Sequence, residues 1–149
     1  MVTRISNSPA ETEALGETWG RSVQSGSVFA LCGDLGAGKT QLVKGFARGL
    51  GFPGRVHSPT FSLVNLYTGG RLTLFHLDLY RLDTPAQIAA AGLEEYLKPA
   101  GVTVIEWAER WFPERAALNP LAGSMPLRWV ELATVTETQR RIQYEDFGA

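Results

Sequence analysis

The clearest evidence for the fold class of this chain is the segment Val28-Phe29-Ala30-Leu31-Cys32-Gly33-Asp34-Leu35-Gly36-Ala37-Gly38-Lys39-Thr40. Its first five residues are a short apolar run that predicts a buried strand. Residues 33–40 match the pattern G-x-x-x-x-G-K-[ST], and helical spacing of apolar residues resumes at Lys39 and ends near Gly51. Strand, glycine-rich loop and helix in this order predict a phosphate-binding P-loop, and they disfavour a plain glycine-rich turn.

Each residue type in the loop has a physical reason to be there. Glycines let backbone N–H groups converge on phosphate oxygens, and Lys39 supplies positive charge to the β- and γ-phosphates. Thr40 can ligate magnesium through its hydroxyl while the helix N-terminus faces the anion. Asp34 is either a solvated or structural carboxylate, or one that handles water or a partner. We expect ATP and Mg²⁺ as ligands. The predicted nucleotide-binding set in and after the loop is Gly33, Asp34, Leu35, Gly36, Ala37, Gly38, Lys39, Thr40 and Gln41.

A P-loop also needs a carboxylate at the tip of a nearby strand, to hold magnesium through water and to position the nucleophile. Asp78 follows the apolar run 74–77, and Glu106 follows 102–105. We expect both to be catalytic together with Lys39, and both to join Thr40 in binding the metal. Our hypothesis assigns Asp78 mainly to magnesium and Glu106 mainly to the attacking water. The alternative for each is a strand-end carboxylate that is merely solvated or capping.

The segment His57-Ser58-Pro59-Thr60 follows the P-loop helix, where P-loop proteins commonly place a loop that senses the γ-phosphate. Thr60 is therefore expected to contact the nucleotide, the alternative being a threonine that begins a strand. His57 and His76 lack the spacing of a metal site, which favours structural or supporting roles. Trp107 is expected either to border the nucleotide or to pack in the core.

The rest of the chain predicts further helices and strands. A first helix should begin at Ser8-Pro9-Ala10-Glu11, because a capping serine precedes proline and an acid, with an inward stripe of Ala14, Leu15, Thr18, Trp19 and Val23. Other expected elements are strands 61–67 and 71–77 around a tight Gly69-Gly70 turn, short helices over 88–91 and 94–97, strand 102–105, a helical piece at 108–112, and a hairpin of 127–135 with 139–147. We therefore predict a single α/β P-loop domain over 1–149, with a mixed, partly antiparallel sheet flanked by helices and a C-terminal β-hairpin.

Composition limits the partners that the chain can hold by itself. The 149 residues carry a net charge of −1, with eleven arginines and three lysines and no basic run. We therefore do not expect the chain to bind nucleic acid or an anionic membrane by its own electrostatic attraction. The single cysteine, Cys32, predicts a buried structural thiol. With no signal peptide or membrane-length apolar run in view, we expect a cytoplasmic protein.

Five motifs in order resemble one family, the TsaE (formerly YjeE) ATPases of bacterial tRNA threonylcarbamoyladenosine biosynthesis. They are the loop at 33–40, Ser58-Pro59-Thr60-Phe61, His76-Leu77-Asp78-Leu79-Tyr80-Arg81, Gly92-Leu93-Glu94-Glu95-Tyr96 and Ile105-Glu106-Trp107-Ala108-Glu109. The resemblance implies weak ATP hydrolysis and association with the TsaD–TsaB pair, so that tRNA is met only through the complex. It ties Thr40, Asp78 and Glu106 to magnesium and hydrolysis, makes Thr60 switch-like, and brings Thr12 to the nucleotide.

Two other functions remain open from the residues alone. A small-molecule phosphotransferase would use the same loop, but it usually needs an arginine-bearing lid and an acceptor pocket, and neither is recognisable. A non-hydrolysing module would use ATP only to order a binding surface, and the two strand-end carboxylates argue against it. Guanine specificity is disfavoured because no Asn-Lys-x-Asp pattern occurs.

Overall fold

The structure, a computed structural model, describes residues 1–56, 63–112 and 126–147. Its helices are α1 (Pro9–Ser22), α2 (Lys39–Gly49), α3 (Pro85–Ala90) and the 3₁₀ turns η1 (Glu94–Leu97) and η2 (Ala108–Arg110). Its strands are β1 (Val2–Ser6), β2 (Val28–Cys32), β3 (Val64–Tyr67), β4 (Leu74–Asp78), β5 (Val102–Glu106), β6 (Leu127–Thr134) and β7 (Arg140–Phe147).

All seven strands join one mixed sheet in the order β1-β7-β6-β2-β5-β4-β3. The inner strands β6, β2, β5 and β4 run parallel, while β3, β7 and β1 add to the two sides as antiparallel neighbours. Every residue of β2 is buried, as its apolar run predicts. The predicted fold class is confirmed, including the C-terminal hairpin of β6 and β7.

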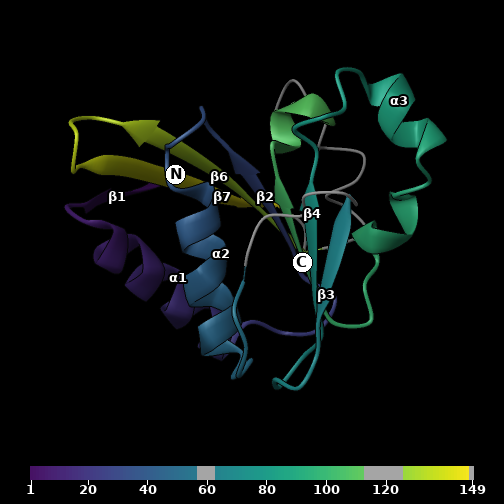
Figure 1. Ribbon diagram of the computed structural model, residues 1–149, viewed down its shortest axis with the longest axis horizontal. Coiled ribbons are helices and arrows are strands. Elements are labelled where there is room, and N and C mark those ends of the chain that lie inside the picture. The colour runs from purple at the N-terminus through teal and green to yellow at the C-terminus, as the bar shows by residue number, and fades with distance from the viewer. Residues whose placement is uncertain (57–62, 113–125, 148–149) are drawn as a thin grey trace.

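Two apolar cores lie on opposite faces of the sheet, and alternate residues of β2 serve each of them. Phe29 and Leu31 pack with the side chains of α1 and α2, whereas Val28, Ala30 and Cys32 pack with those of α3, η1 and η2. Figure 1 shows α1 and α2 together on one side of the molecule and α3 well apart from them. Cys32 is buried as predicted, and burial raises the pKa of its thiol well above the ordinary range.

Helix α1 starts as its sequence predicts, because the Ser8 side chain accepts a hydrogen bond from the Glu11 backbone N–H. The predicted inward stripe is only partly right, since Ala14 and Thr18 are exposed. The buried face consists instead of Thr12, Gly16, Trp19 and Gly20. Two of these four residues are glycines because the backbones of α1 and α2 approach so closely that a side chain at Gly16 would overlap the Leu42 carbonyl.

The connection between β3 and β4 differs from the predicted tight turn at Gly69-Gly70. Tyr67 pairs with Leu74, so the chain leaves the ladder over 68–73. Arg71 explains the longer loop, because its backbone N–H donates to Leu50 O at 2.6 Å and its guanidinium donates to Gly20 O and Val23 O, each at 2.8 Å. These bonds tie the loop to the ends of α1 and α2 rather than to a hairpin.

Strand β1 was not predicted, since four of its five residues are exposed and show no buried alternation. Strand β1 forms by pairing with the side of β7 that does not face β6. The two strands are antiparallel and pair from Val2↔Tyr144 to Ser6↔Arg140. None of the helices within the described residues has the length and apolar character that crossing a bilayer requires.

Candidate functional site

The glycine-rich loop lies at the carboxyl end of β2 and turns directly into α2. Gly38 has φ 103° and immediately precedes the helix, a conformation that a side chain rarely adopts. Gly33 has φ 146°, and a Cβ there would overlap the Leu132 carbonyl of β6. The loop therefore packs against the sheet and leads into the N-terminus of α2, where a helix presents the backbone N–H groups and the positive end of its dipole.

Lys39 is 5% exposed, and its ammonium group hydrogen-bonds to backbone carbonyls of the loop that precedes it. Its Nζ donates to the Gly33 carbonyl and, at 2.9 Å, to the Asp34 carbonyl. Burial lowers the pKa of Lys39, while nearby carboxylates, foremost that of Glu109, oppose the shift. The ammonium group thus has two backbone oxygen acceptors within the loop itself.

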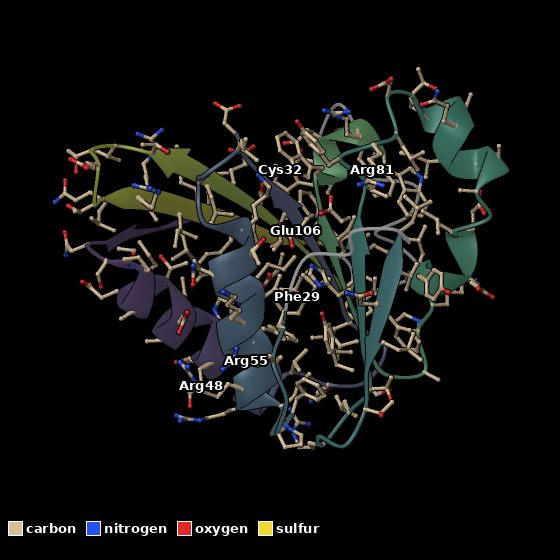
Figure 2. All side chains as sticks on the ribbon, viewed as in Figure 1. Phe29, Cys32, Arg48, Arg55, Arg81 and Glu106 are labelled. Atoms are coloured by element: carbon tan, nitrogen blue, oxygen red, sulfur yellow. The ribbon has the colours of Figure 1, made fainter. Side chains whose placement is uncertain are left out.

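Glu106 joins the loop to the sheet from the last position of β5. Its side chain is 3% exposed and accepts hydrogen bonds from Thr40 Oγ1, at 3.0 Å to Oε1 and 3.3 Å to Oε2. Figure 2 shows Glu106 between the strands and α2. The structure thus brings together the P-loop threonine and one of the two predicted carboxylates.

Asp78 is the second strand-end carboxylate and lies directly beside the first, because β4 and β5 are parallel with Asp78 opposite Glu106. It is half-buried, and its Oδ1 accepts from the Tyr80 backbone N–H at 3.0 Å. Burial raises the pKa of Asp78, and the bond from Tyr80 opposes that rise. The hydroxyl of Thr40 and these two carboxylates are oxygen donors of the kind that Mg²⁺ prefers. Within the described ranges, no group of three or more His, Cys, Asp and Glu residues could hold a metal ion by itself.

Glu109 is a site residue that the sequence reasoning missed. Its Oε2 accepts a hydrogen bond from the Gly33 backbone N–H at 3.0 Å, and Oε1 is buried without a partner among the described residues. Burial raises the pKa of Glu109, which the Gly33 N–H and Lys39 partly offset. Glu109 lies three residues after Glu106, in the turn that follows β5. This spacing was the sequence feature from which its place beside the loop could have been predicted.

Trp107, whose place the sequence left open, borders the phosphate loop. Lys39 Nζ lies 3.9 Å from the centroid of its ring, and the Tyr80 ring packs against it at 5.1 Å. Its backbone has φ 60°, the one positive φ outside glycine in the described residues. That conformation is costly for a bulky residue, and it turns the chain sharply between Glu106 and η2. Trp111 stacks on Phe112 at 5.1 Å and is partly buried at the edge of a core.

The remaining predicted site residues differ in how far they are buried around the loop. Leu35 is 78% exposed at the tip of the loop, Asp34 is exposed, and Gln41 is half-buried in the first turn of α2. Thr12 is buried beneath the loop, where its hydroxyl is 2.7 Å from Ser6 Oγ and its methyl group faces Gly38. His57 and Thr60 lie outside the described residues.

A residue of the C-terminal hairpin also touches the loop. Arg140 donates to the Gly36 carbonyl from Nε at 3.3 Å and from Nη2 at 3.2 Å. The same guanidinium donates to backbone carbonyls of its own turn, such as that of Thr136 at 2.9 Å. The hairpin thereby supports the outer side of the P-loop, and no local sequence pattern predicts this contact.

Comparison with known proteins agrees with the fold described above. A family model described as "Threonylcarbamoyl adenosine biosynthesis protein TsaE" matches residues 6–142. The chain belongs to the TsaE family. The five motifs that suggested the resemblance therefore identified the family correctly, and the P-loop NTPase fold places the chain in a nucleotide-binding class.

Three relatives share the name "tRNA threonylcarbamoyladenosine biosynthesis protein TsaE". The Synechocystis protein is 45% identical over 103 residues, covering 66% of this chain and 65% of its own length. The Bacillus subtilis protein is 44% identical over 67% of this chain and 62% of its own length, and the Haemophilus influenzae protein is 42% identical over 75% and 73%. The matched segment thus spans less than two thirds of the first two relatives. The crystal structure of Bacillus subtilis YdiB, 28% identical, superposes with a TM-score of 0.73 over 99% of this TsaE chain and 86% of YdiB.

Proposed function

We propose that this member of the TsaE family binds ATP with Mg²⁺, hydrolyses it slowly, and serves tRNA threonylcarbamoyladenosine synthesis as its nucleotide-dependent subunit. The observation that carries the proposal is the hydrogen bond from the Thr40 hydroxyl to Glu106. A P-loop threonine in contact with a strand-end carboxylate is the arrangement in which a metal-binding group and a water-positioning group meet.

Each described residue has a distinct task in this proposal. Lys39 exchanges its bonds to the loop carbonyls for phosphate oxygens, and the N-terminal N–H groups of α2 hold the same anion. Thr40 would ligate Mg²⁺ directly and Asp78 through water. The ion, when bound, neutralises charge on the β- and γ-phosphate oxygens. Glu106 orients the attacking water, because its carboxylate lies beside the threonine hydroxyl.

Phosphate release from ATP tests the hydrolysis. The wild type should release phosphate steadily, and Lys39→Ala should abolish release by weakening nucleotide binding. Lys44→Ala is the matched control, because Lys44 is an exposed lysine on the same helix. Glu106→Gln should keep ATP bound but slow hydrolysis, Thr40→Ala should impair magnesium-dependent hydrolysis more than binding, and Asp78→Asn should reduce metal dependence.

Three outcomes would redirect the proposal. Normal hydrolysis in both carboxylate variants would remove them from catalysis. Transfer of labelled γ-phosphate to an organic acceptor rather than to water would indicate a phosphotransferase. If the wild type releases no more phosphate than the Lys39→Ala variant, the remaining interpretation is a nucleotide-dependent binding module.

The proposed partner is the TsaD–TsaB pair in the cytoplasm, with tRNA engaged only through that complex. The support is the P-loop, with Glu106 in contact with Thr40, in a chain of net charge −1 without a basic run. A ligand shifts a conformational equilibrium only by its differential affinity for the two states, so γ-phosphate contacts at Thr60 would be the source of the switch.

Pull-down of the pair with ATP, ADP and no nucleotide tests this switch. ATP should give the strongest recovery, and Thr60→Ala should reduce the difference between nucleotides. Equal recovery in all three conditions would contradict the switch. Tight, salt-sensitive binding of tRNA by the isolated chain would contradict indirect contact.

A further inference from the structure

His76 is the most deeply buried polar side chain near the site, and the mechanism above does not use it. It lies in β4 with 0% exposure, two residues before Asp78. Its Nε2 is 2.5 Å from Glu106 Oε2. Among the described residues, Thr40 and His76 are the two hydrogen-bond partners of the Glu106 side chain, and they approach it from α2 and from β4.

The two ring nitrogens of His76 have different surroundings. Nε2 faces the Glu106 carboxylate, to which a proton on Nε2 would donate a hydrogen bond. His76 Nδ1 is buried without a partner in the described part of the chain. A bare acceptor there costs less than an unpaired N–H donor, so the tautomer with its proton on Nε2 fits the surroundings.

Packing alone does not account for this residue. Its neighbours on the same face of β4 and β5 include Leu74 and Val104, both almost fully buried apolar side chains. An apolar residue at position 76 would fill the same interior without burying an unpartnered ring nitrogen. Among the described residues, the one polar contact that His76 makes is to Glu106, the carboxylate that the proposed function assigns to the attacking water.

We infer that His76 is a positioning residue that holds Glu106 in its working orientation. When Thr40 turns its hydroxyl to the metal ion, the bond from Thr40 to Glu106 is lost. The bond from His76 then keeps Oε2 fixed, so that Oε1 stays directed toward the loop. This inference rests on the proposed hydrolysis, because it assigns His76 a role only through Glu106.

Two isosteric variants test the bond itself. A glutamine amide nitrogen can take the place of Nε2, whereas an asparagine amide nitrogen falls near Nδ1. His76→Gln should retain most of the turnover. His76→Asn should lower kcat by about 10–100-fold, as loss of supporting partners does at other sites, with affinity for a non-hydrolysable ATP analogue changed less than about threefold. Equal turnover in the two variants, or an equal loss of kcat and analogue affinity, would overturn the inference.

A double-mutant cycle separates positioning from a general effect on the fold. In a Glu106→Gln background, His76→Asn should cause no further loss of kcat, because its effect passes through Glu106. Independent, multiplying losses would overturn the inference. Wild-type phosphate release no greater than that of Lys39→Ala would instead reject the proposed hydrolysis, and the inference with it. Melting temperature and analogue binding are measured for every variant, and His76→Gln provides the decision if His76→Asn does not fold.

Discussion

Helices α1 and α2 touch backbone to backbone, and one added methyl group should show how much the site depends on that contact. Gly45 of α2 packs on Glu13 of α1. A Cβ at Gly45 would overlap the Glu13 carbonyl oxygen and lie 2.6 Å from its carbon and 2.8 Å from its Cα, where contacts below 3.0 Å are essentially never seen. Because the obstacle is backbone rather than a flexible side chain, Gly45→Ala must push the helices apart.

Two opposing effects set the size of the change. Alanine is favoured over glycine inside a helix by about 0.5–1 kcal/mol. Overpacking of a close contact costs about 1–3 kcal/mol, and we expect the upper part of that range because the overlap is with backbone. The net loss of about 1–2 kcal/mol corresponds to a melting temperature about 2–8 °C lower for a chain of this size.

The displacement should also reach the phosphate site, since α2 begins at Lys39. We therefore expect weaker binding of an ATP analogue along with the lower melting temperature, measured by calorimetry and by thermal unfolding. Lys44→Ala places the same side chain one position earlier on the exposed face and should change stability by less than about 0.5 kcal/mol. A Gly45→Ala protein that melts above the wild type would refute the reasoning, because helix propensity would then exceed the supposed clash.

Two further predictions concern the surroundings of the loop. Burial raises the pKa of Glu109 above 4.5, so the folded protein holds that proton more tightly than the unfolded chain. The wild type should therefore lose stability relative to Glu109→Gln as the pH rises from about 4.5 through the raised pKa, and a melting-temperature difference that stays constant from pH 4 to 8 would contradict this. Arg140→Ala removes the hydrogen bonds to Gly36 and should weaken nucleotide affinity by about 2–12-fold, equivalent to about 0.5–1.5 kcal/mol. Unchanged affinity in titration calorimetry would show that the hairpin does not support the loop.

Much of the site could be predicted because its signals are local. A strand, a glycine-rich loop and a helix follow one another within 28–50, and their residue types depend on the backbone and charge at each position. The carboxylates Asp78 and Glu106 were found as ionisable groups that end apolar runs. The structure places the two opposite each other in neighbouring strands, which makes both of them candidates for the same site.

Local sequence patterns predicted the P-loop, the family and most of the helices and strands, since capping, periodicity and turn chemistry act over a few residues. Which distant groups meet depends instead on how the elements pack in three dimensions. His76 reaches Glu106, Glu109 reaches Gly33 and Arg140 reaches Gly36 across 30, 76 and 104 residues of chain. The glycine face of α1 and the pairing of β1 with β7 depend in the same way on a distant partner. Contacts of this kind follow from the order of strands in the sheet and the approach of the two helices, and no short-range pattern specifies either.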